Sequence, residues 1–256
     1  MFGLKSWRRK RLRTQPFPAR WIKILEKNVP LYNRLPGADK KELQEHILIF
    51  MAEKNFEGCG GLSMTEEIKV TISAQACLLL LHRETDYYPG LYSILVYPSA
   101  FVAECYEELL PGLYVRDIQV HLGESWKRGA VVLSWDHILS SASDIYDRHN
   151  VVLHEFAHQL DSEDGQVDGA PVLKDRSMHI TWARRLGEEY AKLQEDARHG
   201  RQTLLDQYGA TNPAEFFAVA TECFFEKPVQ MQKKHPELYA ELKQFYQQDP
   251  AKFTWN

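Results

Sequence analysis

The chain has 256 residues, of which 44% are hydrophobic and 26% are charged, as is usual for a globular protein. Its net charge of −4 argues against general nucleic-acid binding. The four cysteines are scattered and form no C-x-x-C pair, which excludes a disulfide scaffold and a structural zinc cluster. This length accommodates one large domain or two modest ones.

The first fifteen residues are strongly basic. No apolar stretch follows them, as a secretory signal peptide would require, and the longest apolar run, near Ala74–Leu81, is too short to cross a bilayer. We therefore expect a cytoplasmic protein with no nucleic-acid or membrane partner, in which residues 1–15 form a solvated, partly ordered tail. The alternative is that this tail contacts an acidic partner or a membrane surface.

Residues 16–85 are predicted to form a helical N-terminal part. Ala19–Lys27 is a short amphipathic segment, and Asp39–Phe56 places apolar residues at helical spacing. A third helix begins at Thr65, with acids in its first turn. Its later turns, residues 72–81, are apolar nearly all round, which is typical of a helix at the centre of a core.

The pattern changes after residue 85. Three runs rich in β-branched and aromatic residues, bounded by Gly or Pro, predict the strands of a small sheet: Tyr92–Tyr97, Leu113–Leu122 and Ala130–Trp135. The segment Gly123–Trp126 is expected to be a turn, and the chain after Trp135 is expected to be helical again. The sequence thus predicts an α+β fold.

The sequence H-E-x-x-H, at His154–His158, is the strongest chemical signal. On a helix, residues four apart lie on the same face, so His154 and His158 can reach one Zn²⁺. Glu155 is offset by one position and can act as a general base beside the metal without binding it. Asp144 or Asp147 is expected to cap this helix, and Asp161 to end it.

A catalytic zinc site has three protein ligands, so one more is needed. Asp164 has the spacing of one class of zinc protease, but Asp161 replaces the Gly that allows the turn in that class. Glu215 and Glu222, seven residues apart, lie on one face of a downstream helix and are better candidates.

Several features of that downstream region indicate how it folds. Arg176–His199 is predicted to be a long amphipathic helix, and Asn212-Pro213 is a strong helix start with Glu215 at the third position. Glu215 therefore has an alternative role as a capping-box glutamate. Tyr208 is either an oxyanion-stabilising phenol or an ordinary packing aromatic.

The motif helix and other stretches resemble the Mlc titration factor A family of bacterial zinc peptidases. The resemblance covers nearly the whole chain except the basic first thirteen residues. The matching stretches are Pro16–Pro18, Ala74–Leu78, Tyr97-Pro98, Phe101-Val102, Gly123–Trp126, Val131–Trp135, His154–Asp161, Asn212–Val219 and Phe245–Pro250.

The resemblance implies a site and a fold. It makes His154, His158 and Glu215 the ligands of one zinc per chain, Glu155 the catalytic base and Tyr208 the oxyanion residue. It implies a gluzincin-like metallopeptidase, with a zincin-like catalytic domain over residues 86–256. The catalytic core is similar to that of the anthrax lethal factor protease domain, which has the same Tyr-to-Glu spacing.

The resemblance also leaves one point open and implies two functions. Val219 stands where thermolysin-type enzymes have the Asp that orients a histidine, so the orienting acid is open, with Asp161 as a candidate. The implied activity is that of a weak aminopeptidase on short peptides. The alternative is a mainly non-catalytic regulator that binds an Mlc-type transcriptional repressor of sugar uptake genes, with zinc stabilising its fold.

Overall fold

The computed structural model describes residues 2–99, 101–110, 113–121, 123–126, 129–143 and 149–253, with side chains for 3–99, 129–141 and 149–253. The α-helices in the described chain are α1 Phe2–Arg13, α2 Ala19–Asn28, α3 Pro30–Arg34, α4 Gly37–Glu53, α5 Glu66–Leu78, α6 Trp135–Ser143, α7 Val151–Asp161, α8 Arg176–Arg198, α9 Pro213–Glu226, α10 Pro228–Lys234 and α11 Pro236–Tyr246. The strands are β1 Asn55–Gly58, β2 Ser93–Tyr97, β3 Phe101–Leu110, β4 Leu113–His121, β5 Gly123–Trp126 and β6 Ala130–Ser134. Short 3-10 turns are η1 Ser162–Asp164, η2 Gln207–Ala210 and η3 Pro250–Lys252.

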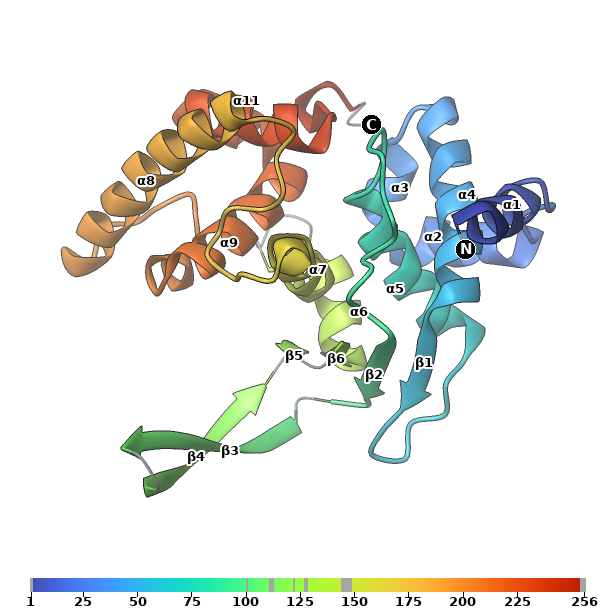
Figure 1. Cartoon of the computed structure of the whole chain (residues 1–256), viewed down its shortest axis with the longest axis horizontal. Helices are drawn as coiled ribbons and strands as arrows, with labels where there is room; N and C mark the ends of the chain where they lie inside the picture. Colours follow the sequence, from blue (N-terminus) through green and yellow to red (C-terminus); the bar gives the residue numbers. More distant parts are fainter. Residues whose placement is uncertain are drawn as a thin grey trace.

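Helix α7 lies at the centre of the molecule. Figure 1 shows it between α1–α5 on one side and α8, α9 and α11 on the other, with the larger sheet below. It packs against α5, α6 and α9 and against strands β5 and β6. The helix that carries the H-E-x-x-H motif is therefore held from several directions.

The larger sheet has the strand order β1-β2-β6-β5, in which β1, β2 and β6 are parallel. Strand β5 is at one edge and runs antiparallel to β6, from Gly123 opposite Leu133 to Trp126 opposite Ala130. The turn predicted for residues 123–126 is therefore wrong, because hydrogen bonding to β6 decides the conformation of this short segment. Strands β3 and β4 form a separate antiparallel pair. The α+β class is confirmed, and the three predicted strands correspond to β2, β4 and β6. The prediction that they share one sheet is wrong for β4, which pairs with β3 instead.

The helix predicted to reach Phe56 ends earlier, at Glu53. The Nζ of Lys54 donates hydrogen bonds to the carbonyls of Tyr88 and Leu91, at 2.7 and 2.6 Å. The backbone N–H of Asn55 donates to the carbonyl of Tyr92. Pairing with the chain that leads into β2 thus converts the end of the predicted helix into strand β1.

The basic N-terminal segment was predicted to be a solvated tail, but it forms helix α1. Its Arg9 makes two hydrogen bonds to the carboxylate of Glu53 on α4, at 2.8 and 2.7 Å. Lys5 and Arg9 both form ion pairs with Asp86. Acids from two other parts of the chain therefore neutralise one face of this helix, which composition alone does not reveal.

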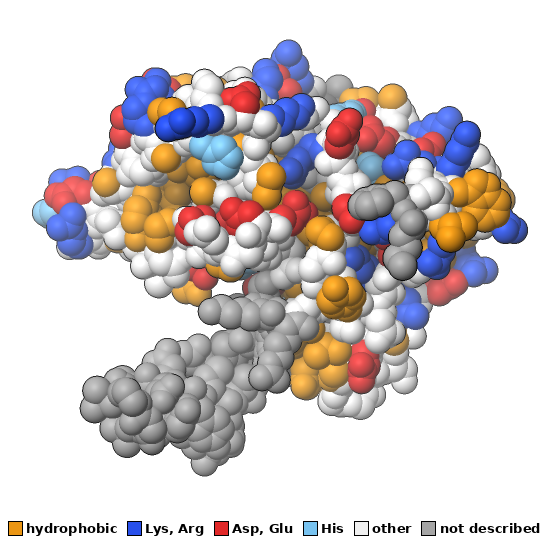
Figure 2. All heavy atoms as spheres, in the orientation of Figure 1, with side chains coloured by type: hydrophobic (Ala, Val, Ile, Leu, Met, Phe, Trp, Pro, Cys, Tyr) orange, Lys and Arg blue, Asp and Glu red, His pale blue; other side chains and the backbone are white. Residues whose placement is uncertain are grey.

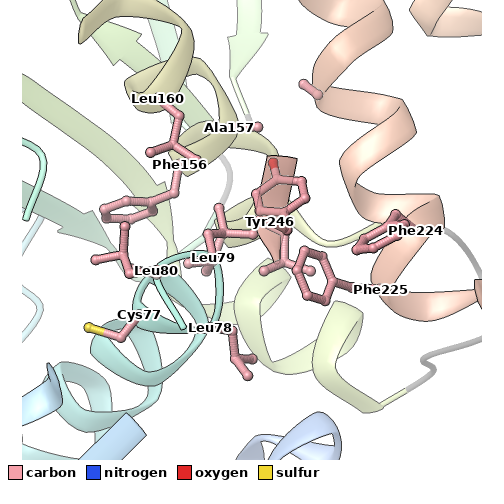
Figure 3. Close-up of a cluster of buried hydrophobic side chains, with 14 of the residues drawn as sticks. Cys77, Leu78, Leu79, Leu80, Phe156, Ala157, Leu160, Phe224, Phe225 and Tyr246 are labelled. Carbon is pink, nitrogen blue, oxygen red and sulfur yellow. The ribbon is translucent and has the colours of Figure 1, made fainter. Parts of the chain in front are cut away.

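The predicted central helix is confirmed as α5, whose residues from Val70 to Leu78 are all buried. Figure 3 shows Cys77–Leu80 next to Phe156 and Leu160 of α7, with Phe224, Phe225 and Tyr246 nearby. These residues belong to one cluster of buried side chains that extends from Leu25 to Tyr246. The division of the chain at residues 15 and 85 stays a prediction. In the part of the chain that the structure describes, no helix has the length and apolar content needed to span a membrane.

Candidate metal centre

Asn150 begins the motif helix. Its side-chain Oδ1 accepts a hydrogen bond from the backbone N–H of Leu153 at 3.0 Å, which is the geometry of an N-cap. The helix then runs to Asp161, as predicted. The expectation that Asp144 or Asp147 caps it is wrong; both lie outside the described residues, and the cap is Asn150.

Helix α9 begins as the sequence predicts. The Oδ1 of Asn212 accepts a hydrogen bond from the N–H of Glu215 at 3.0 Å, and Pro213 occupies the first helical position. This start places Glu215 in the first turn, where its carboxylate reaches the histidines of α7.

Three side-chain atoms form a nearly equilateral triangle. The Nε2 of His154 lies 3.0 Å from the Oε2 of Glu215 and 3.2 Å from the Nε2 of His158, and the third edge, from His158 to Glu215, is 3.4 Å. Atoms that bind one tetrahedral zinc at about 2.0–2.1 Å lie about 3.3 Å apart. Among the described residues, these three form the one group of potential ligands close enough to hold a metal ion.

Glu222 holds His154 from the opposite side of its ring. Its Oε1 lies 2.7 Å from the Nδ1 of His154, and its Oε2 accepts a 2.6 Å hydrogen bond from the backbone N–H of Asn150. A carboxylate at Nδ1 fixes the proton there, so that the lone pair of Nε2 is free to bind a metal ion between the three atoms. Glu222, which the sequence offered as a candidate ligand, therefore orients His154 and lies outside the group of ligand atoms.

The charges around this triangle favour a cation between its three atoms. Burial by itself would lower the pKa of His154, but the hydrogen bonds with Glu215 and Glu222 outweigh it and raise that pKa. Burial opposes ionisation of Glu215 as well, yet the two histidines lower its pKa to about 2. The two imidazole nitrogens and the carboxylate oxygen face one another, and a positive charge between them stabilises this arrangement. A metal ion would supply that charge.

Glu155 lies beside the triangle and is buried. Burial raises the pKa of this carboxyl to about 7, although His154 and His158 act in the opposite direction. Its Oε2 makes no hydrogen bond to a described residue. The carboxylate is therefore available to exchange a proton near neutral pH.

Tyr208 lies on η2, close to His154. Its ring centre is 6.1 Å from that of His154, and 57% of the residue is exposed. Burial of part of the ring raises the pKa of its hydroxyl, and the nearby Glu215 and Glu155 raise it further, so the phenol stays protonated. Asp206 caps the turn that carries it, since its Oδ1 accepts a hydrogen bond from the N–H of Tyr208.

The loop after α7 fixes the position of α9. Asp161, at the end of α7, accepts a 2.9 Å hydrogen bond from the N–H of Gly169, and the carbonyl of Gly169 accepts one from the indole of Trp182. Gly169 has a φ of +79°, and a Cβ there would lie 2.3 Å from the carbonyl oxygen of Pro213. Only glycine therefore allows this close approach to the first turn of α9.

Two further acids that the sequence offered as candidates lie outside the site. Asp161 does not orient a histidine, because its Oδ1 and the Nδ1 of His158 make no hydrogen bond to any described residue. Asp164 is exposed and outside the triangle, and it accepts a hydrogen bond from the N–H of Gln166. Two residues that shape the site, Asn150 and Gly169, were not predicted from the sequence. Asn is itself a preferred N-cap residue, and Asp168-Gly169 is a turn-forming pair, but the contacts of both residues with α9 depend on the tertiary structure.

Two histidines and a carboxylate from a second helix, next to a buried glutamate, are the groups that metallopeptidases use. Comparison with known families gives the same class. The chain belongs to the glucose-regulated metallo-peptidase M90 family, whose model matches residues 4–247.

Individual relatives are similar over most of their length. An uncharacterised protein of Synechocystis is 40% identical over 248 residues, which cover 96% of this chain and 90% of the relative. Mlc titration factor A of Klebsiella pneumoniae is 31% identical over 227 residues, covering 87% of this chain and 84% of the relative. Mlc titration factor A of Yersinia pestis is 31% identical over 236 residues, covering 91% and 85%.

Proposed function

We propose that this protein is a zinc-dependent, gluzincin-like peptidase in which His154, His158 and Glu215 hold one zinc ion. The observation that carries the proposal is the triangle of ligand atoms, with edges of 3.0, 3.2 and 3.4 Å, which fits tetrahedral zinc. A catalytic rather than a structural site is supported by the number of ligands, since structural zinc sites have four protein ligands. In this proposal residues 86–256 form a zincin-like catalytic domain and residues 16–85 a helical part packed on it.

The residues around the triangle have complementary roles in peptide hydrolysis. A zinc ion supplies Lewis-acid chemistry when bound, which lowers the pKa of water and polarises a carbonyl. Glu155 takes a proton from the attacking water and passes it to the nitrogen of the leaving amine. The hydroxyl of Tyr208 donates a hydrogen bond to the oxyanion that develops on the substrate. Glu222 keeps His154 in the correct tautomer throughout.

The substrate we propose is a short peptide cleaved near its amino end. Strand β5 is at the edge of the sheet and packs against α7. A peptide can add to such an edge through backbone hydrogen bonds, which recognise an extended chain without requiring a particular sequence. Strand β5 lies next to α7, the helix that carries His154 and His158 (Figure 1), which supports β5 as the strand that binds the peptide.

Metal analysis of purified variants tests the site. We expect one zinc per chain in the wild type, and its loss in His154→Ala and in His158→Ala. Glu215→Ala should weaken zinc binding more than Asp164→Ala, which is a matched control because Asp164 is an exposed acid outside the triangle. Full zinc retention in both histidine variants would refute the site.

A second candidate function is binding of an Mlc-type transcriptional repressor. The observation that favours it is the match to relatives named Mlc titration factor A over most of both chains. Binding and hydrolysis can coexist, and Glu155→Gln separates them, since it removes the proposed base and keeps the shape of the side chain. Repressor binding that survives in this variant supports a separate docking surface; its loss assigns docking to the active-site cleft.

A further inference from the structure

Helix α1 has one face attached to the rest of the protein. Lys5, Arg9 and Leu12 lie on this face, three and four residues apart. Arg9 pairs with Glu53 and Asp86, Lys5 pairs with Asp86, and Leu12 packs against the hydrophobic core. These contacts neutralise the inward-facing charges and fix which side of the helix faces outward.

The opposite face combines apolar and basic side chains. Leu4, Trp7 and Arg11 lie on it, with Lys10 beside them, whereas Arg8 turns towards α4 and donates a hydrogen bond to the carbonyl of Ala52 at 3.1 Å. Leu4 is 76% exposed and Trp7 is 63% exposed, and both are among the largest exposed hydrophobic side chains of the described chain. Figure 2 shows hydrophobic side chains surrounded by basic ones over the position of α1. We call Leu4, Trp7, Lys10 and Arg11 the outer face of α1.

The charge of this region is opposite to that of the whole protein. The first 25 residues contain eight Lys and Arg and no Asp or Glu, whereas the chain has a net charge of −4. Within the part of the chain that the structure describes, Lys10 and Arg11 have no ion-pair partner. By contrast, Arg20 and Lys27 on α2 are paired with Glu66 and Glu67. Two exposed cations with no ion-pair partner among the described residues therefore lie beside Leu4 and Trp7 on the outer face of α1.

We propose that the outer face of α1 is a docking surface for an anionic lipid bilayer. Trp and Leu insert at the boundary between headgroups and acyl chains, while Lys and Arg beside them contact anionic headgroups. Trp in particular is favoured at this boundary, because its ring is apolar and its N–H is polar. An acidic protein would match the charges but not the exposed Trp and Leu, which favours the bilayer. The protein would then lie on the membrane surface without crossing the bilayer, contrary to the expectation of no membrane partner.

Cosedimentation of the full-length protein with vesicles tests this proposal. The probes are phosphatidylcholine vesicles with about 30% phosphatidylglycerol, and phosphatidylcholine vesicles alone. We expect binding to the anionic vesicles that weakens as salt is added, and much weaker binding to the neutral ones. Each Lys or Arg near an anionic surface contributes about fivefold to binding, so Lys10→Gln with Arg11→Gln should bind about 30-fold more weakly.

Two further double variants distinguish the outer face from general charge effects. Leu4→Ser with Trp7→Ser should weaken vesicle binding at least about tenfold while leaving all the charges in place. Lys233→Gln with Lys234→Gln removes the same charge from two exposed lysines on α10, and should change binding less than twofold. The altered side chains are exposed, so circular dichroism and thermal unfolding should match the wild type.

Three results would overturn the proposal. The first is wild-type protein that sediments equally with anionic and neutral vesicles, or with neither. The second is equal loss of binding in the α10 and α1 charge variants, which would indicate a nonspecific charge effect. The third is salt-sensitive binding to polyglutamate without binding to vesicles, which would assign the outer face to an acidic protein partner.

Discussion

Glu222→Gln tests the arrangement of the site more sharply than removal of a ligand. The carboxylate of Glu222 accepts two hydrogen bonds, from the ring of His154 at 2.7 Å and from the backbone of Asn150 at 2.6 Å. A glutamine has one oxygen and one NH₂ group in nearly the same shape. Whichever way the amide turns, its NH₂ faces one of the two donors, so one buried donor loses its partner.

The size of the effect follows from these two bonds. Loss of one hydrogen bond to a charged acceptor costs about 1.5–3 kcal/mol of unfolding free energy. For a protein of this size, the unfolding temperature should fall by about 4–10 °C. Loss of the carboxylate behind a metal-binding histidine typically weakens metal affinity about 10- to 100-fold. We expect both effects in Glu222→Gln.

Thermal unfolding of the metal-free protein and zinc competition with a chromophoric chelator measure the two effects separately. Glu189→Gln is the matched control, because Glu189 forms a pair with His235 at 2.7 Å, the same distance as between Glu222 and His154. The control should lose some stability and keep its zinc affinity. Wild-type zinc affinity in Glu222→Gln, or an equal loss in Glu189→Gln, would refute the role assigned to Glu222.

Three other predictions concern single residues. Gly169→Ala should lower the unfolding free energy by at least about 2 kcal/mol and weaken zinc binding, because the added Cβ meets the first turn of α9. Gly165→Ala is the control, since Gly165 has a similar φ of +90° but nothing lies within 4 Å of an added Cβ. An equal loss of stability in both variants, measured by thermal unfolding, would contradict the reasoning. Tyr208→Phe should lower kcat by about 10²- to 10³-fold with little change in KM or zinc content, and steady-state kinetics within twofold of wild type would return Tyr208 to a packing role. The hydrogen bond with His46 lowers the pKa of Glu42 from 4.5 to about 2, so its contribution to stability is complete above pH 4.5 and is lost as the pH falls towards 2. Because Glu42 is one-third exposed, we expect Glu42→Gln to be about 1 kcal/mol less stable at pH 6, with a difference that shrinks towards pH 2.5 in urea unfolding. A constant difference across that range would show that the ionised carboxylate is not responsible.

Local sequence signals predicted the elements that carry the site. The spacing of His154 and His158 requires only the period of a helix, and the start of α9 is indicated by Asn212 at the N-cap, Pro213 at the first helical position and Glu215 at the third. Glu215 and Glu222 were correctly placed on one face of that helix. Their different roles depend on the ring of His154, which lies between them. Seven residues advance a helix by about 10 Å, so one carboxylate reaches Nε2 and the other reaches Nδ1.

Features that depend on distant partners were not predictable in the same way. Strand β5 is short and contains turn-forming residues, and its extended conformation comes from pairing with β6. The basic segment became helix α1 because Glu53 and Asp86 lie where its inward-facing cations can reach them. Neither partner is near in the sequence, so composition predicted a solvated tail.

The most direct test of the central proposal is hydrolysis of a library of short peptides by zinc-loaded wild type and zinc-loaded Glu155→Gln. We predict cleavage near the amino end of peptides by the wild type. Glu155→Gln should keep one zinc per chain and lose at least about 10²-fold in rate, since both proton transfers run through this carboxylate. Equal rates in the two proteins, or no cleavage of any peptide by the zinc-loaded wild type, would contradict the assignment of this site to peptide hydrolysis.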